Sequence, residues 1–279
     1  MSLDQVFLVI SLSTYAVSAL ALVAYFFSRD SWLKNLAVPL VIVGCACQFA
    51  QLIARYELTH IWPLLNLYGS LSLFSAMSVA IFIFFAFRYR LWFAGGFVVA
   101  LAAIFLAYGL TWNEGSLPPV PSLQSYWAKI HVPIVVSSYA AFMVASVISG
   151  IYLIKNYLGA RPGRGQLWLN TIPSLAQLDV LTYRIVAVGL PLLTVGIITG
   201  AWWAKEAWGA YWQWDPKETA ALSLWIFYAA YMHLHTRNAF RGTFSAWLGL
   251  LGFPLMLFVF LIVNIVIGGP GISLHSYKM

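Results

Sequence analysis

Residues 181–218 read LTYRIVAVGLPLLTVGIITGAWWAKEAWGAYWQWDPKE, and this stretch decides the fold class. Residues 181–203 form an apolar run, and a helix needs about 20 mostly apolar residues to cross a bilayer. The run passes directly into Trp202–Trp214, a segment that holds five of the 13 tryptophans of the chain. The stretch therefore raises two questions: how many such spans the chain has, and what so many indole rings bind.

The composition of the whole chain indicates a membrane protein. Its 279 residues are 62% hydrophobic and 8% charged, with a mean hydropathy of +0.85. A soluble domain carries about 25% charged residues. Long apolar runs recur from one end of the chain to the other, which excludes a soluble globular class and predicts a protein that crosses the membrane several times.

Apolar runs of membrane-spanning length occur about eight times along the chain. Short polar turns separate most of them, and one of the longer connections carries the tryptophans. The runs lie at about residues 5–27, 35–54, 67–87, 91–110, 131–157, 181–203, 219–236 and 243–267. The sequence thus predicts an all-α transmembrane bundle of about eight spans in a single membrane domain, residues 1–279, with a Trp-rich extracytoplasmic loop at 202–218.

The basic residues predict the orientation of the bundle, because cytoplasmic loops carry an excess of Lys and Arg. If the amino terminus lies outside, most basic residues fall on the inner side, among them Arg88, Arg90, Arg161, Arg164 and Arg237. The acidic residues favour the opposite side. Both termini and the Trp-rich loop then lie outside, and the formal charge of +7 is a topology signal that needs no nucleic-acid partner.

Five histidines are the main candidates for binding a ligand, since a histidine in or near a bilayer usually has a partner or a function. In the predicted topology His60, His131 and His275 lie at the outer side, whereas His233 and His235 lie near the inner end of the seventh span. The outer histidines flank the Trp-rich loop.

This combination of histidines and indole rings predicts a haem site. Imidazole is a common axial ligand of haem iron, and indole faces offer a flat apolar disc a large, rigid contact area. Lys205 and Lys217 would meet the acidic propionates. The candidate rings are those of Trp202, Trp203, Trp208, Trp212 and Trp214. The alternative is the ordinary enrichment of tryptophan at membrane interfaces, above all for Trp202 and Trp203, together with a structural role for each histidine.

His233 and His235 are two residues apart, so on a helix they point to different faces and cannot both serve one site. At most one of them faces the bundle, and a single buried histidine leaves the second axial ligand to another chain. The alternative is that both reach the inner interface beside Arg237.

The residues DPKE at 215–218 predict the start of a helix. An Asp N-cap, a proline at the first helical position and a glutamate three residues after the cap form a capping box. Asp215 is therefore interpreted mainly as the cap of the seventh span, which would fix the positions of Trp212 and Trp214, rather than as a catalytic acid.

Residues 208–215, WGAYWQWD, resemble the W-G-x-x-W-x-W-D signature of haem-handling membrane proteins of cytochrome c maturation. The continuation DPKET resembles the CcsA (ResC) branch of the system II pathway. Further similarities are HIWPLLNLYGSL at 60–71, KIH at 129–131 and LHSY at 274–277. Gly69 stands where the family has a glutamate, and Ala220 stands where a tryptophan is common.

The resemblance implies that His131 and His275 are the outer ligands of haem b, with the tryptophans, Asp215 and His60 around it. It implies a membrane-embedded ligand at His233, with His235 as the alternative, and a CcsB (ResB) partner that supplies the second membrane ligand. It also implies an integral protein of the bacterial inner membrane or the thylakoid, with the Trp-rich loop on the periplasmic or lumenal side.

The function that the resemblance implies is that of a holocytochrome c synthase (haem lyase) subunit. Such a subunit moves haem to the outer face and presents it for thioether attachment to the CxxCH segment of apocytochrome c. A haem exporter without lyase activity is the alternative. A di-haem electron-transfer protein is the least compatible with the sequence, because it would place four histidines on facing helices, and only His233 and His235 lie clearly within the interior of a predicted span.

Overall fold

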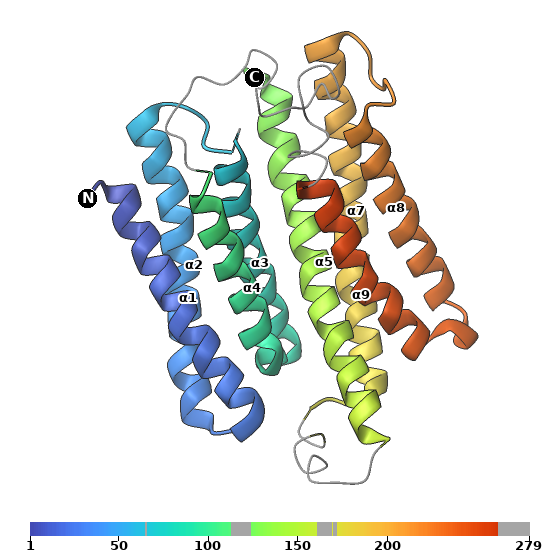
Figure 1. Ribbon diagram of the computed structural model, residues 1–279. Helices are drawn as coiled ribbons and strands as arrows, with labels where there is room; N and C mark the ends of the chain where they lie inside the picture. Colours follow the sequence, from blue (N-terminus) through green and yellow to red (C-terminus); the bar gives the residue numbers. More distant parts are fainter. Residues whose placement is uncertain (65, 113–123, 161–168, 170–171, 262–279) are drawn as a thin grey trace. The chain divides into compact units, whose positions relative to one another are not determined.

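The computed structural model describes residues 1–64, 66–112, 124–160, 169 and 172–261 (Figure 1). Regular secondary structure within these ranges consists of helices only, which confirms the predicted all-α class. The long helices are α1 Leu3–Ser28, α2 Ser31–Thr59, α3 Leu67–Tyr89, α4 Gly95–Leu110, α5 Tyr126–Gly159, α7 Leu175–Trp208, α8 Pro216–His235 and α9 Thr243–Leu257, with short 3₁₀ helices η1 Leu91–Ala94 and η3 Asn238–Phe240.

Seven segments among the described residues are long and apolar enough to cross a membrane, which confirms the predicted polytopic bundle. They are α1, α2, α3, η1 together with α4, α5, α7, and α9 extended to Leu261. Helix α8 forms where the seventh span is predicted, but it is more polar, because Lys217 and Glu218 lie in its first turn and His233 and His235 in its last. The crossing of the membrane by α8 stays a prediction.

The chain divides into two compact units, Met1–Pro119 and Val120–Met279. The first unit holds α1, α2, α3 and α4. Helix α1 lies against α2 and α4, and α3 also lies against α2 and α4. The expected single domain over residues 1–279 stays a prediction.

Polar side chains in the core of the first unit bond to each other and to backbone carbonyls. Gln48 Nε2 donates to the carbonyl of Ser72 at 2.9 Å, and Ser72 Oγ donates to Oε1 of Gln51 at 3.1 Å. Ser75 Oγ donates to the carbonyl of Ala102 at 2.8 Å and thereby joins α3 to α4. Since an unsatisfied polar group is costly in hydrocarbon, these bonds hold the helices together within the bilayer.

The second unit consists of α5, α7, α8 and α9, with α5 packed along both α7 and α9. Glycines on α7 allow α5 to approach closely. A Cβ atom on Gly189 would lie 2.6 Å from Cε1 of Phe142, and one on Gly196 would lie 2.5 Å from Cγ2 of Val135. Small residues at such contacts permit the tight van der Waals packing that drives helix association in lipid.

Helices α5, α7 and α8 alternate in direction within the second unit (Figure 1). The start of α5, the end of α7 and the start of α8 therefore meet at one end of this unit. The start of α7, the end of α8 and the start of α9 meet at the other end. His131 and the tryptophans of residues 202–214 lie at the first end, whereas His235 lies at the second. The unit therefore presents two separate candidate sites.

Candidate functional site

The Trp-rich segment begins as a continuation of α7. The helix runs to Trp208, so Trp202 and Trp203 also lie on its last turns, and the irregular part is restricted to residues 209–215. The structure differs here from the expected loop over 202–218. Residues 204–207, AKEA, are strong helix formers, and the helix continues until Gly209 adopts a left-handed φ of 85° and ends it.

Asp215 begins α8 with the predicted capping box. Its Oδ1 accepts a hydrogen bond from the backbone N–H of Lys217 at 2.9 Å, and Oε2 of Glu218 accepts from the N–H of Asp215 at 3.2 Å. The same glutamate oxygen accepts from the N–H of Gln213 at 2.8 Å. These bonds fix the backbone on both sides of Trp214, which confirms the interpretation of Asp215 as a cap.

His131 lies on the second turn of α5 and contacts the end of α7. Its Nδ1 is 2.8 Å from the carbonyl oxygen of Gly196, and its ring centroid is 5.7 Å from that of Trp203. Since a carbonyl only accepts hydrogen bonds, Nδ1 carries a hydrogen, and in the neutral ring Nε2 then carries the lone pair. Histidines that ligate metals commonly have this arrangement, in which the other ring N–H donates to a carbonyl or carboxylate.

Four indole rings lie near His131, and we refer to Trp127, Trp202, Trp203 and Trp208 as the indole cluster. The centroid of Trp127 is 4.7 Å from that of Trp202, and the centroid of Trp203 is 5.3 Å from that of Trp208. Trp203 is buried, whereas Trp202 is 44% exposed. The cluster therefore combines a packed base with an accessible indole, as binding of a flat apolar ligand requires.

Trp127 is a member of the cluster that the sequence prediction missed. It precedes His131 by four residues on α5, so the two side chains share one face of the helix. This spacing, next to a candidate ligand, is the signal that could have identified it.

Trp212 and Trp214 form a second pair, with ring centroids 5.8 Å apart and ring planes at 90°. Trp214 is 70% exposed and has a φ of 57°. A bulky residue in the left-handed region is strained, and such strain persists where the surroundings impose it, often at functional sites. The pair is therefore a candidate contact surface for a ligand or a partner.

Lys205 is engaged at the end of α7. Its ammonium group donates to the carbonyl of Gly209 at 2.8 Å and lies 5.7 Å from the centroid of the Tyr211 ring. A cation at this position also interacts favourably with the carboxyl end of the helix. The roles of Lys205 and Lys217 as partners of haem propionates stay predictions.

The predicted grouping of His60 and His275 with His131 is not tested by the described structure. His275 lies outside the described residues, so its pairing with His131 stays a prediction. His60 belongs to the first unit, where its backbone ends α2 with a left-handed φ of 53° and its side chain is exposed.

Gly69, which stands in place of the family's glutamate, has a packing role at the start of α3. A Cβ atom at this position would fall on the carbonyl oxygen of Pro63. The N–H of Gly69 donates to Oδ1 of the N-cap residue Asn66 at 2.7 Å. The chain after His60 thus folds back onto a position without a side chain, and a glutamate would not fit in this arrangement.

The two histidines of α8 have different surroundings, as their spacing predicts. His235 is 5% exposed, and its Nε2 lies 3.0 Å from Oδ2 of Asp179 on α7. The ring of Tyr183 stacks on it, with centroids 4.4 Å apart. His233 is exposed at the surface of α8. His235 is therefore engaged within the chain, whereas His233 faces outward.

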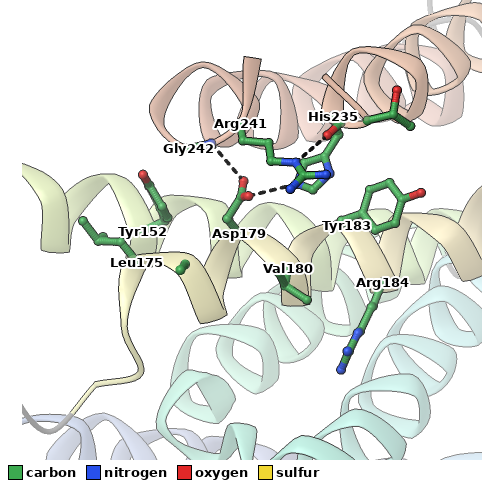
Figure 2. Close-up of a pocket in the computed structure, with 11 residues that line it drawn as sticks. Tyr152, Leu175, Asp179, Val180, Tyr183, Arg184, His235, Arg241 and Gly242 are labelled. Atoms are coloured by element: carbon green, nitrogen blue, oxygen red, sulfur yellow. Dashed lines mark hydrogen bonds and ion pairs between the residues drawn. The ribbon is translucent and has the colours of Figure 1, made fainter. Parts of the chain in front are cut away.

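A pocket of about 710 Å³ surrounds the pair of Asp179 and His235 (Figure 2). Oδ1 of Asp179 accepts from the N–H of Gly242 at 3.2 Å, and Nε of Arg241 donates to the carbonyl of His235 at 2.9 Å. The bonds join the start of α7, the end of α8 and the turn before α9. The sequence prediction missed Asp179, because it lies just before the predicted span at 181–203, whereas the structure places it within α7.

Comparison with known proteins identifies the family. The profile of the family described as cytochrome C assembly protein matches residues 64–270. The chain is 34% identical over 256 residues to the cytochrome c biogenesis protein CcsA of Chlamydomonas reinhardtii, and the match covers 88% of this chain and 69% of that protein. It is 36% identical over 256 residues to CcsA of Prochlorococcus marinus strain NATL1A, with 82% and 80% covered.

The fold is also similar to the solved structure of the cytochrome c haem lyase CcmF. The TM-score is 0.68 at 18% sequence identity, and the match covers 92% of this chain and 46% of the CcmF chain. This chain thus spans about half the length of CcmF, and the similarity concerns the fold. From its sequence matches, the chain belongs to the cytochrome c assembly protein family, in the CcsA group of cytochrome c biogenesis proteins.

Proposed function

We propose that this chain presents haem b at the outer face of the membrane as a subunit of a holocytochrome c synthase, a haem lyase. The observation that carries the proposal is the geometry of His131, whose ring is held beside the indole cluster by the 2.8 Å bond from Nδ1 to the carbonyl of Gly196. The family supports a role in cytochrome c biogenesis. The haem type, the lyase activity, the partner chain and the side of the membrane belong to the proposal.

Haem is the substrate in this proposal, and the chain supplies axial ligands and apolar contacts. Nε2 of His131 takes one axial position on the iron, and His275 takes the other. The indole cluster provides the apolar surface for the porphyrin, since Trp202 leaves part of its ring accessible. Trp212 and Trp214 provide further contacts from the segment that Asp215 holds in place.

The proposed reaction adds each thiol of a CxxCH segment across one vinyl group of the haem. A sulfur–carbon bond forms, the thiol proton is transferred to the other vinyl carbon, and no net oxidation or reduction occurs. The histidine of the segment replaces one outer ligand of the iron. The chain acts by orienting the reactants, which can lower a barrier by about 7–11 kcal/mol, while the reactivity resides in the haem.

For the membrane-embedded ligand we favour His233. Its exposure on α8 allows a second chain to supply the opposite axial ligand, whereas His235 is bonded to Asp179. The proposed second chain is a CcsB-type membrane protein. The proposed location is the bacterial inner membrane or the thylakoid, with the indole cluster on the periplasmic or lumenal side.

Co-expression with a CcsB-type partner and an apocytochrome c, in cells that lack other maturation systems, tests the proposal. We expect covalent, haem-stained cytochrome with the native chain. His131→Ala should lower its yield by at least roughly tenfold, because loss of a ligand costs more than loss of its supporting contacts. Added imidazole should restore part of the yield by occupying the vacated axial position.

The same assay separates the alternatives, provided that immunoblots show equal amounts of each chain. Normal product from His131→Ala would contradict the ligand role of His131. Haem bound to the native complex without covalent product would favour the haem exporter over the lyase.

A further inference from the structure

Gly200 lies directly beneath the imidazole of His131. A Cβ atom on Gly200 would lie 2.8 Å from Cε1 and 2.9 Å from Nδ1 of that ring. Distances this short are tighter than van der Waals contact, so the ring can occupy its position only because residue 200 has no side chain. Gly200 therefore differs from the other glycines at this interface, because the side chain that it accommodates is the imidazole of His131, the candidate haem ligand.

Gly196 and Gly200 together form a surface of α7 that fits one face of α5. The two glycines are one helical turn apart, as are the α5 residues opposite them, Val135 and His131. Gly196 accommodates Val135 and supplies the carbonyl that accepts from Nδ1 of His131, whereas Gly200 accommodates the ring. The two contacts fix the ring in two respects: one selects its tautomer and the other sets how near it lies to the backbone of α7.

We propose that Gly200 is a positioning residue for haem ligation, which acts by keeping His131 in the Nδ1–H tautomer, the neutral form in which Nε2 can coordinate iron. This inference rests on the proposed function of His131. A methyl group at residue 200 would displace the ring by several tenths of an ångström or more and would lengthen the 2.8 Å bond to Gly196. Without that bond the imidazole samples both neutral tautomers, and only one of them offers a lone pair at Nε2.

The expected effect of Gly200→Ala on haem is a loss of affinity at the outer site by roughly tenfold, the lower end of the range for removing a contact that orients a metal ligand. Added imidazole should restore haem retention in Gly200→Ala, as we expect for His131→Ala, because it replaces a misdirected ligand. The absorption spectrum of the remaining haem should show altered axial ligation.

Two glycine-to-alanine variants in the same unit serve as matched controls. Gly150→Ala places its Cβ 3.8 Å from Cδ1 of Leu250, an ordinary contact, and should behave as the native chain. Gly189→Ala places its Cβ 2.6 Å from Cε1 of Phe142 and disturbs the same α5–α7 interface away from His131. It should lower thermal stability without changing haem ligation or responding to imidazole.

A second measurement examines the ring in the haem-free chain. ¹⁵N spectra of the histidine side chains, recorded on the full chain in detergent at about pH 8, above the usual histidine pKa, report the neutral tautomer of each ring. His131→Gln assigns the signal. We expect the Nδ1–H form for His131 in the native chain, in Gly150→Ala and in Gly189→Ala, and a mixture of tautomers in Gly200→Ala.

The outcomes distinguish this inference from the proposed function. An Nε2–H tautomer of His131 in the native chain overturns the inference even if Gly200→Ala fails to fold. Native tautomer and native haem ligation in a folded Gly200→Ala also overturn it, while leaving His131 as a ligand. Unchanged haem ligation in His131→Ala would instead refute the proposed function, and with it the part of the inference that concerns haem.

Discussion

Trp214 has a backbone conformation that is unfavourable for a residue with a side chain. Substitution by glycine can therefore separate the effect of backbone strain on stability from the effect of the indole ring on haem retention. Its φ of 57° costs about 1–2 kcal/mol for a residue with a Cβ atom. We therefore expect Trp214→Gly to leave the thermal unfolding midpoint unchanged or to raise it, because glycine adopts this conformation without strain. If the indole contacts haem, the same variant should retain less haem, measured by absorbance of the purified complex.

Trp247 provides the control for this prediction. It is 52% exposed but lies inside the regular helix α9. Trp247→Gly should lower the unfolding midpoint, since glycine inside a helix costs about 1 kcal/mol, and should leave haem retention unchanged. Full haem retention in Trp214→Gly would contradict a contact between the indole of Trp214 and haem.

The ends of three helices in the second unit depend on Asp179. Its carboxylate accepts hydrogen bonds from His235 and from the N–H of Gly242, so it joins α7 to α8 and to the turn before α9. Removing one partner of a buried pair costs about 3–5 kcal/mol. Asp179→Ala should therefore lower the free energy of unfolding by this amount, and Asp179→Asn by less, because its amide oxygen still accepts one bond.

Thermal or detergent-induced unfolding of the purified chain measures this effect. Asp30→Ala is the matched control, because Asp30 is an exposed N-cap of α2 whose side chain makes no capping hydrogen bond. Equal stability of Asp179→Ala and Asp30→Ala would contradict a structural role for the buried pair.

The sequence predicts features that depend on neighbouring residues, but not the contacts between residues far apart along the chain. The apolar runs, the capping box at Asp215 and the separation of His233 from His235 depend on residues a few positions apart, and the structure confirms them. The carbonyl of Gly196 that orients His131 is 65 residues away along the chain, and Asp179 is 56 residues from His235. Such partners depend on how α5, α7 and α8 pack, which hydrophobic periodicity does not specify.

The extension of α7 to Trp208 illustrates a related limit. The predicted span covers residues 181–203, and the tryptophans at its end are compatible with the membrane interface. The backbone follows helix propensity until Gly209 instead. The indole cluster is consequently built on two rigid helices, with Trp127 on α5 and its other members on α7, and only Trp212 and Trp214 lie in the irregular segment.

At the scale of the whole molecule, the exposure of His233 predicts that the second haem site is completed by another chain. His233 lies on the outer surface of α8, and its neighbour His235 is already bonded to Asp179. A complex of this chain with a CcsB-type partner should therefore bind a second haem that the chain alone does not hold. His233→Ala should remove that haem from the complex and leave the haem at the outer site in place.

Iron and haem counted per purified complex measure this prediction, and Ile226→Ala provides the matched control. Ile226 lies two turns before His233 on the same face of α8 and is 55% exposed, but it has no ligating nitrogen. Loss of haem in His233→Ala but not in Ile226→Ala would identify a ligand rather than a damaged interface. The opposite result would be loss of haem in His235→Ala with full retention in His233→Ala. It would identify His235, in the pocket beside Asp179, as the membrane ligand, and the partner chain would then not need to contact α8 at His233.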